Sequence, residues 1–370
     1  MPGTELNIVS FENPYPPDYG GAIEVFYKLK ALHKQGMVIY LHIFVENRTD
    51  YSGLKKYCKR VYTYSKNKTF TSYLSLRPLS VKFRTNKKLA DNLKRNSAPI
   101  LFEGLHTTAV LNKHDFKGRK LIMRAHNIEH HYYRGLAGSA TNLFYKYMLK
   151  YEAHKFSRYE KIVDKVDHLL AISNHEFDYF KENYKPNCHY IPAFQSYDTV
   201  KRLSQFGEYA LYHGDLSIID NLRTARFFIE IFSELDFPLI IAGSKNMRIL
   251  MKETAEYSNI SCRRIESRSD LQHLFAKSHI NLCYSFQRSG TKLKVVHALY
   301  EGRHCLVNKN VIDEQLILDQ CTVAESKEEV IAAVQKLQKS PYKFNTERQE
   351  ALDQVFNTAV NARKIIALLG

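Results

Sequence analysis

The chain of 370 residues is long for a single hydrophobic core and suits two domains of ordinary size. It carries a net charge of +16, and its 44% of hydrophobic residues include no run long enough to span a membrane. The six cysteines are scattered without a Cys-x-x-Cys pair, so we expect reduced thiols and neither disulfides nor a zinc site. The stretch Met1–Glu5 lacks the basic and apolar segments of a secretory signal, which predicts a cytoplasmic protein.

The chain begins with an apolar run, a turn rich in proline and glycine, and an amphipathic helix. Residues 6–11 are the expected strand, residues 13–21 the turn, and the helix is expected from about Ala22. A helix start offers unpaired N–H groups and a partial positive charge, which suits a phosphate. Gly20 and Gly21 would let a ligand approach the backbone closely, although a plain strand-to-helix turn also uses glycine.

Residues 51–100 carry 13 Lys and Arg against a single acid, Asp91. Seven aromatic residues are interleaved with these cations. Three interpretations stay open: a solvated surface of a basic protein, contact with an anionic membrane at its inner face, and nucleic-acid binding. No recognised nucleic-acid module accompanies the charge, so we expect no nucleic-acid partner.

Several ionisable residues follow the strand expected at residues 121–123, in the segment 124–133. His126 is the candidate for proton transfer or for binding a sugar hydroxyl. Arg124 and Glu129 are candidates to orient it or to bind sugar hydroxyls. Zinc binding by His126, Glu129, His130 and His131 is an alternative, but the spacing matches no established zinc signature. A surface loop without function is the other alternative.

A long helix is expected from Ser139 to about Lys165. Its aromatic stripe comprises Phe144, Tyr147, Met148 and Tyr151, and we expect it to pack against a sheet.

Continuous apolar runs alternate with helical patterns through both halves of the chain, which predicts parallel sheets covered on both faces. The expected strands after the first are 38–45, 99–102, 121–123, 169–172, 209–212, 238–242, 280–284 and 305–308. Residues 191–207 are the best boundary between two domains, and residues 344–368 are expected to form one terminal helix. The predicted fold class is therefore α/β, with two Rossmann-like domains whose parallel sheets face each other across a cleft.

A second strand-turn-helix design spans residues 280–302, with the helix expected to start near Gly290. Its turn supplies small residues at a helix start (Ser289, Gly290, Thr291) and three cations suited to a diphosphate (Arg288, Lys292, Lys294). The spacing is not that of a P-loop, which argues against nucleotide triphosphate hydrolysis. Small residues end two neighbouring strands of the same half, at Gly214 and at Gly243–Ser244, and we expect them to line the same ligand site.

In this order the motifs resemble the GT-B glycosyltransferases of family 4, in particular the bacterial branch that builds surface polysaccharides. The glycine turn at residues 16–21 is similar to the acceptor-side loop of that family, and residues 289–302 stand where the family has its Glu-x7-Glu donor motif. The resemblance implies domains at residues 1–192 and 193–349, with a helix at about 350–370 returning to the first domain. It places Gly20, Gly21 and His126 near the reacting sugar, and the segment 289–294 with His297 around the nucleotide sugar.

The resemblance implies a retaining, metal-independent transferase that uses a UDP- or GDP-linked sugar as co-substrate, without a cofactor, and a glycan or lipid-linked acceptor. Ser289 and His297 replace the two glutamates of the family motif. Asp215 and Asp220–Asn221 stand where the family commonly has Arg and Lys. These departures support an alternative, in which a catalytically degenerate GT-B protein acts as a binding or assembly partner.

Overall fold

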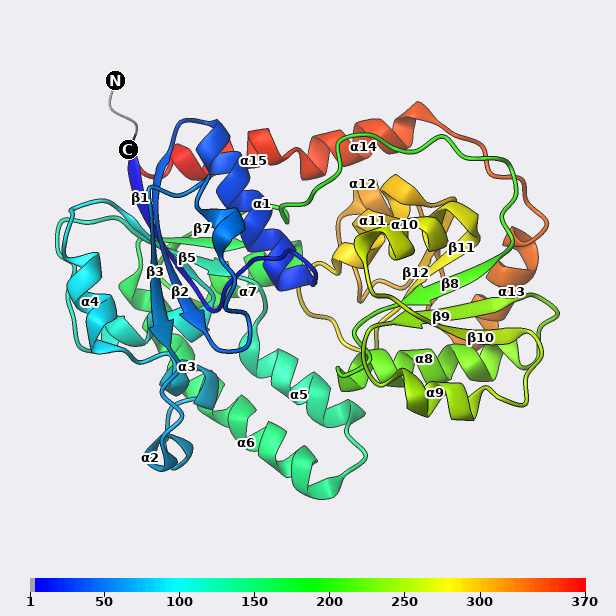
Figure 1. The fold of residues 1–370 in the computed structure, drawn as a ribbon, viewed down its shortest axis with the longest axis horizontal. Coiled ribbons are helices and arrows are strands. Elements are labelled where there is room, and N and C mark those ends of the chain that lie inside the picture. The colour runs from blue at the N-terminus through cyan, green and yellow to red at the C-terminus, as the bar shows by residue number, and fades with distance from the viewer. Residues whose placement is uncertain (1–3) are drawn as a thin grey trace. The chain divides into compact units, whose positions relative to one another are not determined.

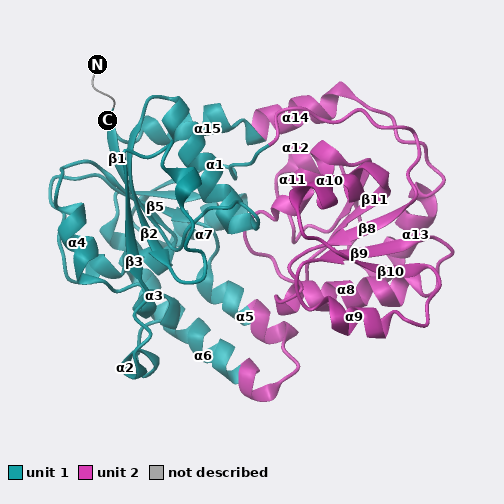
Figure 2. Ribbon diagram, viewed as in Figure 1, with its two compact units in different colours: residues 1–134, 147–196, 356–370 teal, residues 135–146, 197–355 magenta. Residues whose placement is uncertain are grey.

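A computed structural model describes residues 4–370, and so three of the residues on which the expectation about a secretory signal rests lie outside the described part. The chain divides into two compact units (Figures 1 and 2). Unit 1 contains residues 1–134, 147–196 and 356–370, and unit 2 contains residues 135–146 and 197–355. Each unit is an α/β structure built on one parallel sheet.

The sheet of unit 1 has seven strands in the order β3-β2-β1-β4-β5-β6-β7, all parallel. They are β1 (Glu5–Ser10), β2 (Val38–Val45), β3 (Arg60–Ser65), β4 (Ile100–Glu103), β5 (Leu121–Ala125), β6 (His168–Ala171) and β7 (Asn187–Tyr190). Its helices are α1 (Gly20–Lys34), α2 (Phe70–Tyr73), α3 (Leu79–Phe83), α4 (Lys87–Leu93), α6 (Leu143–Tyr159), α7 (Asn174–Asn183) and α15 (Thr358–Ile366). Short 3-10 turns cover Ser52–Leu54, Leu105–Asn112 and Glu160–Lys165. Helix α5 (Glu129–Ser139) starts in unit 1 and ends in unit 2, and the first turn of α6 also belongs to unit 2.

The sheet of unit 2 has six parallel strands in the order β10-β9-β8-β11-β12-β13. They are β8 (Tyr209–His213), β9 (Leu239–Gly243), β10 (Ile260–Arg264), β11 (Ser278–Cys283), β12 (His304–Val307) and β13 (Thr322–Val323). The helices are α8 (Ile219–Phe232), α9 (Met247–Glu253), α10 (Arg268–Lys277), α11 (Leu293–Glu301), α12 (Gln315–Leu318), α13 (Lys327–Leu337) and α14 (Thr346–Phe356). All nine strands expected from the apolar runs are present, which confirms the predicted class of two Rossmann-like parallel sheets.

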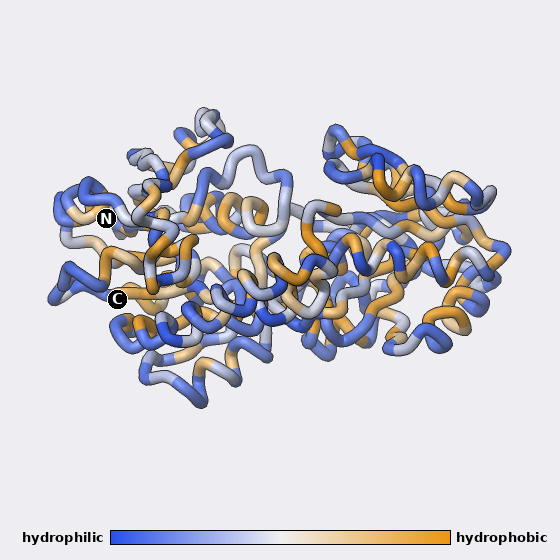
Figure 3. The backbone as a smooth tube through the Cα atoms, turned by 90° about the horizontal axis from the view of Figure 1, so that it is seen from below, coloured by the Kyte–Doolittle hydropathy of each residue, from blue (hydrophilic) through white to orange (hydrophobic). Residues whose placement is uncertain are grey.

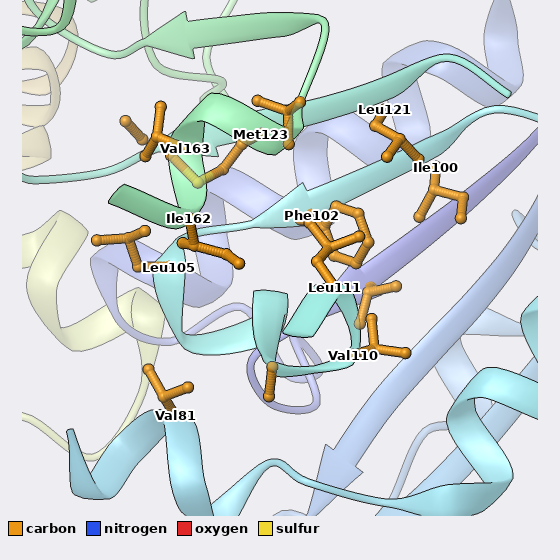
Figure 4. Close-up of a cluster of buried hydrophobic side chains, with 14 of the residues drawn as sticks. Val81, Ile100, Phe102, Leu105, Val110, Leu111, Leu121, Met123, Ile162 and Val163 are labelled. Atoms are coloured by element: carbon orange, nitrogen blue, oxygen red, sulfur yellow. The ribbon is translucent and has the colours of Figure 1, made fainter. Parts of the chain in front are cut away.

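The central strands are buried because helices cover both faces of each sheet. Every residue of β4, β5 and β11 is buried. One cluster in unit 1 joins Ile100, Phe102 and Met123 of the sheet to Val81 of α3 and Ile162 of the turn after α6 (Figure 4). Figure 3 shows hydrophobic stretches in the interior of each unit and hydrophilic stretches along the loops. The two units therefore have cores of their own.

The end of the chain packs on helix α1. Ala362, Ile365 and Leu369 join the cluster that contains Val25 and Leu29 of α1, as expected for a helix that returns to the first domain. The prediction of a single helix over residues 344–368 is wrong, because the chain breaks between α14 and α15. Asn357 caps α15 by accepting hydrogen bonds from the amides of Ala359 and Val360.

The expected packing of the aromatic stripe on α6 is also wrong. Phe144, Tyr147, Met148 and Tyr151 are exposed by 43–75%. The opposite face of the helix packs inward instead, through Leu149, Glu152, Ala153 and Phe156. Helix α6 therefore has apolar residues on two faces, and only one of them is covered.

Candidate active site

In unit 1 the carboxyl ends of β4 and β5 hold a histidine and a glutamate in hydrogen-bond contact, and the histidine reaches the surface. His126 follows β5, and its Nε2 lies 3.0 Å from Oε2 of Glu103, the last residue of β4. The His126 ring meets the ring of Phe11 edge-on at 5.7 Å, and 15% of its side chain is exposed. A buried carboxylate and an aromatic ring thus fix the orientation of a partly accessible imidazole.

Behind His126 the charges alternate in sign through the interior. Glu103 pairs with Lys28 at 2.8 Å, Lys28 with Glu24 at 3.1 Å, and Glu24 with Arg124 at 2.9 Å. Burial alone would raise the pKa of Glu24, but Arg124, Lys28 and His126 lower it to about 2. Burial acts likewise on Glu103, whose pKa is nevertheless lowered by Lys28 and His126. Both carboxylates are therefore charged at neutral pH.

Arg124 lies at the inner end of this network with a fully buried side chain. Its guanidinium donates to Glu24, to the carbonyl oxygen of Ile191 and, at 3.1 Å, to that of Pro192. It therefore joins the end of β5 to α1 and to the residues after β7, and it touches His126 only through the intervening charges.

The other ionisable residues of segment 124–133 meet separate partners. Glu129 lies 3.3 Å from Nε2 of His106, whose Nδ1 is 2.9 Å from the hydroxyl of Ser80. His130 pairs with Glu160 at 3.2 Å. Within residues 4–370, no three His, Cys, Asp or Glu side chains form a group that could hold a metal ion.

Gly20 and Gly21 form the first turn of α1, which contains no acidic residue. A Cβ on Gly20 would meet no atom within 4 Å, so the space beside it is open. A Cβ on Gly21 would lie 3.0 Å from the ring of Tyr19 and 3.1 Å from that of Phe11. Because Phe11 also contacts His126, the glycine turn and the histidine share one aromatic neighbour.

In unit 2 small residues end two neighbouring strands. The amide of Gly214 donates to the carbonyl of Ala242 at 3.1 Å, and a Cβ on Gly243 would lie only 2.9 Å from the carbonyl oxygen of Gly214. The strand ends can approach this closely because Gly243 has no side chain. Ser244, which follows, is exposed.

The loop between β11 and α11 is held at several points. Ser285 donates to Asp220 at 2.6 Å, and the amide of Lys292 donates to the carbonyl of Val311 at 2.9 Å. Gly290 has a φ of +55°, which favours glycine. The prediction that the helix starts near Gly290 is wrong by three residues, since α11 begins at Leu293 and the segment 285–292 is an ordered loop.

The three candidate cations of this loop lie in different surroundings. Arg288 is 54% exposed and 3.7 Å from Asp313, while Lys292 donates to the carbonyl of Ser289 at 2.7 Å. The ammonium of Lys294 is enclosed and lies 4.9 Å from the centre of the Tyr212 ring.

Three enclosed nitrogen atoms at this edge of the sheet have no hydrogen-bond partner among residues 4–370. They are Nε2 of His213, Nζ of Lys294 and Nε2 of His297. Burial lowers the pKa of His297 to about 4, with a smaller effect of Arg268. Burial, followed by the charges of Lys294 and His297, also lowers the pKa of His213, which indicates that the three groups are neighbours. Both imidazoles are neutral at pH 7. Burial lowers the pKa of Lys294 as well, and the nearby Cys283 and Asp220 oppose this effect.

Two acids that follow β8, Asp215 and Asp220, already have partners. Asp215 lies 3.3 Å from Lys245 and accepts hydrogen bonds from Ser217, which lower its pKa against the opposing effect of burial. Asp220 accepts the hydrogen bond of Ser285.

Sequence reasoning did not single out Glu24, Lys28, Glu103 or His213 as site residues. Two signals were available. Glu24 and Lys28 stand four residues apart on the apolar face of α1, and Glu103 ends an otherwise apolar strand. A charged residue in such a position requires a buried partner.

No family model matches the chain. An uncharacterized 44.6 kDa protein in the cps region of Klebsiella pneumoniae is 25% identical over 314 residues, which are 80% of each chain. Within the part of the chain that the structure describes, no helix is long and apolar enough to cross a membrane.

Solved structures of glycosyltransferase type resemble the whole chain. TarM matches with a TM-score of 0.72 at 10% identity, over 99% of both chains. HepE of Anabaena, in complex with UDP and glucose, matches with a TM-score of 0.67 at 11% identity, over 99% of both. Sucrose-phosphate synthase of Thermosynechococcus elongatus matches with a TM-score of 0.65 at 13% identity, over 99% of this chain and 98% of that one. With its two parallel sheets, the chain has the GT-B fold of these glycosyltransferases.

Proposed function

We propose that this chain is a retaining, metal-independent glycosyltransferase. It would move a sugar from a UDP- or GDP-linked donor to a glycan or lipid-linked acceptor in cell-surface polysaccharide synthesis. The GT-B fold supports transferase chemistry, and the complex of HepE with UDP and glucose supports a nucleotide-sugar donor. The relative in the cps region supports the polysaccharide context.

The observation that carries this proposal is the group of unpartnered nitrogens in unit 2. Lys294 Nζ is an enclosed ammonium without a hydrogen-bond acceptor among residues 4–370, and His213 and His297 add two further unsatisfied nitrogens. Leaving such groups buried is costly unless a ligand completes them. A nucleoside diphosphate offers negative oxygens for the ammonium and hydroxyl groups for the neutral imidazoles.

The chemistry requires stabilisation of a departing diphosphate. As the bond from the anomeric carbon to the phosphate oxygen breaks, negative charge develops on the diphosphate and positive charge on the sugar. Lys294, with Lys292 and Arg288 at the loop, would stabilise the diphosphate electrostatically. The acceptor hydroxyl would attack from the face that the diphosphate leaves, and its proton would pass to the leaving phosphate, so that no protein nucleophile is needed.

In unit 1, His126 would bind the sugar or the acceptor hydroxyl. Glu103 holds the imidazole through Nε2, which leaves Nδ1 for a substrate group. Gly20 and Gly21 would allow the substrate to approach the start of α1, where the backbone N–H groups are unpaired.

A second candidate is a GT-B protein that binds a partner and has lost transfer activity. The resemblance to family 4 favours it, because by that resemblance Ser289 and His297 would stand in the places of the two motif glutamates. Asp215 and Asp220–Asn221 would stand in the places of the usual cations.

Release of the nucleoside diphosphate separates the two candidates. Purified protein is incubated with a panel of UDP- and GDP-sugars, and UDP or GDP formed by transfer or slow hydrolysis is measured. We expect release from at least one donor, and loss of that release in Lys294→Met. A protein that releases no diphosphate from any donor, although it is folded, would support the binding role.

A further inference from the structure

Unit 1 exposes large apolar side chains on α2, on the loop that follows it and on α6. We define the α2–α6 patch by its six residues: Phe70, Leu74, Leu76, Tyr147, Met148 and Tyr151. They are exposed by 43–84%. Large apolar side chains gathered at this density on a surface mark a site of interaction.

The two elements of the patch are linked through α3, which contacts α2. The amide of Leu79, the first residue of α3, donates to the Glu152 carboxylate on the inward face of α6 at 2.8 Å. Figure 1 shows α2 and α6 along the same lower edge of unit 1. The patch is therefore a property of one compact unit.

On α6 the exposed residues form a stripe of their own. Tyr147 and Tyr151 are one helical turn apart, Met148 lies beside them, and Phe144 continues the stripe by one turn. Since the core of unit 1 covers only the opposite face of α6, this stripe does not serve to hold the fold together.

The basic residues near the patch favour an anionic partner. Lys150 lies over the ring of Tyr147, and Arg77 follows Leu76 directly. The segment 51–100, which contains α2, has 13 basic residues and only one acid. A second copy of the chain would bring two strongly basic surfaces together, whereas an anionic lipid surface complements them.

We propose that the α2–α6 patch docks this protein on an anionic phospholipid bilayer. The aromatic and leucine side chains enter the boundary between headgroups and acyl chains, and the surrounding Lys and Arg contact the lipid phosphates. This inference does not depend on transferase activity, so it can fail while the proposed function holds.

The chain contains no tryptophan, which permits a direct test by fluorescence. Tyr147→Trp places a single indole in the patch, and Phe206→Trp places one at an exposed site of unit 2 as the matched control. With vesicles of phosphatidylglycerol and phosphatidylcholine, we expect the emission of Tyr147→Trp to shift to shorter wavelength and that of Phe206→Trp to stay unchanged. Equal behaviour of the two indoles would overturn the proposal.

Co-sedimentation with the same vesicles tests the two components of docking. Leu76→Glu with Tyr147→Glu should weaken binding by about tenfold or more, because apolar side chains become charged. Ile249→Glu with Met251→Glu, an exposed apolar pair on α9 of unit 2, should leave binding unchanged. Binding should also fall with added salt and with vesicles of phosphatidylcholine alone.

Two results would overturn the inference in this assay. One is binding that ignores lipid charge or survives Leu76→Glu with Tyr147→Glu. The other is self-association in solution, measured by sedimentation, that the same substitutions abolish while wild-type protein shows no affinity for vesicles. Circular dichroism of each variant confirms that it has folded.

Discussion

His126 is the residue whose position most resembles that of a group acting on substrate. It is partly exposed, and the Glu103 carboxylate and the Phe11 ring fix its orientation. A histidine that is only structural would be buried on all sides, as His42 is.

We expect His126→Ala to lower turnover by about 10²-fold or more, because a positioned imidazole is lost, while donor affinity stays nearly intact. Initial rates and calorimetric titration of the donor measure the two effects. His33→Ala, at an exposed site of the same unit, is the control. A loss of less than about threefold would assign His126 a structural role.

Arg124 was predicted from sequence to orient His126 or to bind sugar hydroxyls, and its burial now suggests a test. Arg124→Met should lower the free energy of unfolding by about 3–5 kcal/mol, since it leaves Glu24 buried with one partner fewer. Urea unfolding of the variant, with Arg119→Met as the comparison, measures the change. Unchanged stability together with lost activity would instead indicate a direct contact between Arg124 and substrate.

His42 should make stability depend on pH. It is fully buried between Tyr64 and Asn7, and burial, with a contribution from Arg119, lowers its pKa from 6.5 to about 3. The unfolded chain therefore takes up a proton below about pH 6.5 that the folded chain refuses. The folded state therefore loses no stability through His42 above about pH 6.5, and it loses stability progressively as the pH falls from there toward 3.

Between pH 7 and pH 5, His42 lowers the free energy of unfolding by about 2 kcal/mol. Urea unfolding at both pH values should show a smaller loss for His42→Gln than for wild type. His33→Gln should keep the wild-type difference. An identical pH dependence in His42→Gln and wild type would contradict this account.

At the scale of elements, the central strands could be predicted and the edge strands could not. The four strands that sequence reasoning missed are β3, β7, β10 and β13, and each is the edge of its sheet. Edge strands face solvent and carry polar residues, so the continuous apolar run that identified the other nine is absent. In β7, for example, no residue is buried.

The stripe on α6 shows a different limit. Its spacing correctly indicated a helix with an apolar face, but periodicity cannot tell a face that packs on a sheet from one that stays exposed. The charged network of Glu24, Lys28 and Glu103 was missed for a related reason, because pairing across α1 and β4 depends on tertiary contacts. The site residues proposed from sequence are placed by the structure, and their roles remain predictions.

The loop between β11 and α11 should depend on its glycine. Gly290→Ala puts a Cβ on a backbone with positive φ, which costs about 1 kcal/mol and distorts the segment that carries Ser289 and Lys292. We expect donor affinity to fall several-fold. Gly118→Ala, also at positive φ but in a loop of unit 1, should lower the free energy of unfolding by a similar amount and leave donor affinity unchanged. Equal donor affinity in both variants would show that the loop between β11 and α11 does not contribute to donor binding.

For the whole molecule we expect two separable activities. We expect donor binding in unit 2, where one side-chain nitrogen each of Lys294, His213 and His297 has no hydrogen-bond partner among residues 4–370. We expect lipid docking at the α2–α6 patch of unit 1. Each can be removed without touching the other, since the residues concerned belong to different compact units.

Calorimetric titration with UDP, GDP and their sugar conjugates tests most directly whether unit 2 binds a nucleoside diphosphate through the enclosed side chain of Lys294. Wild type, Lys294→Met and the exposed control Lys252→Met are compared. We expect wild type to bind at least one nucleotide with a submillimolar Kd. Binding should be weaker by about tenfold or more in Lys294→Met and unchanged in Lys252→Met. Failure of wild type to bind any of them, or equal affinity in Lys294→Met, would contradict it.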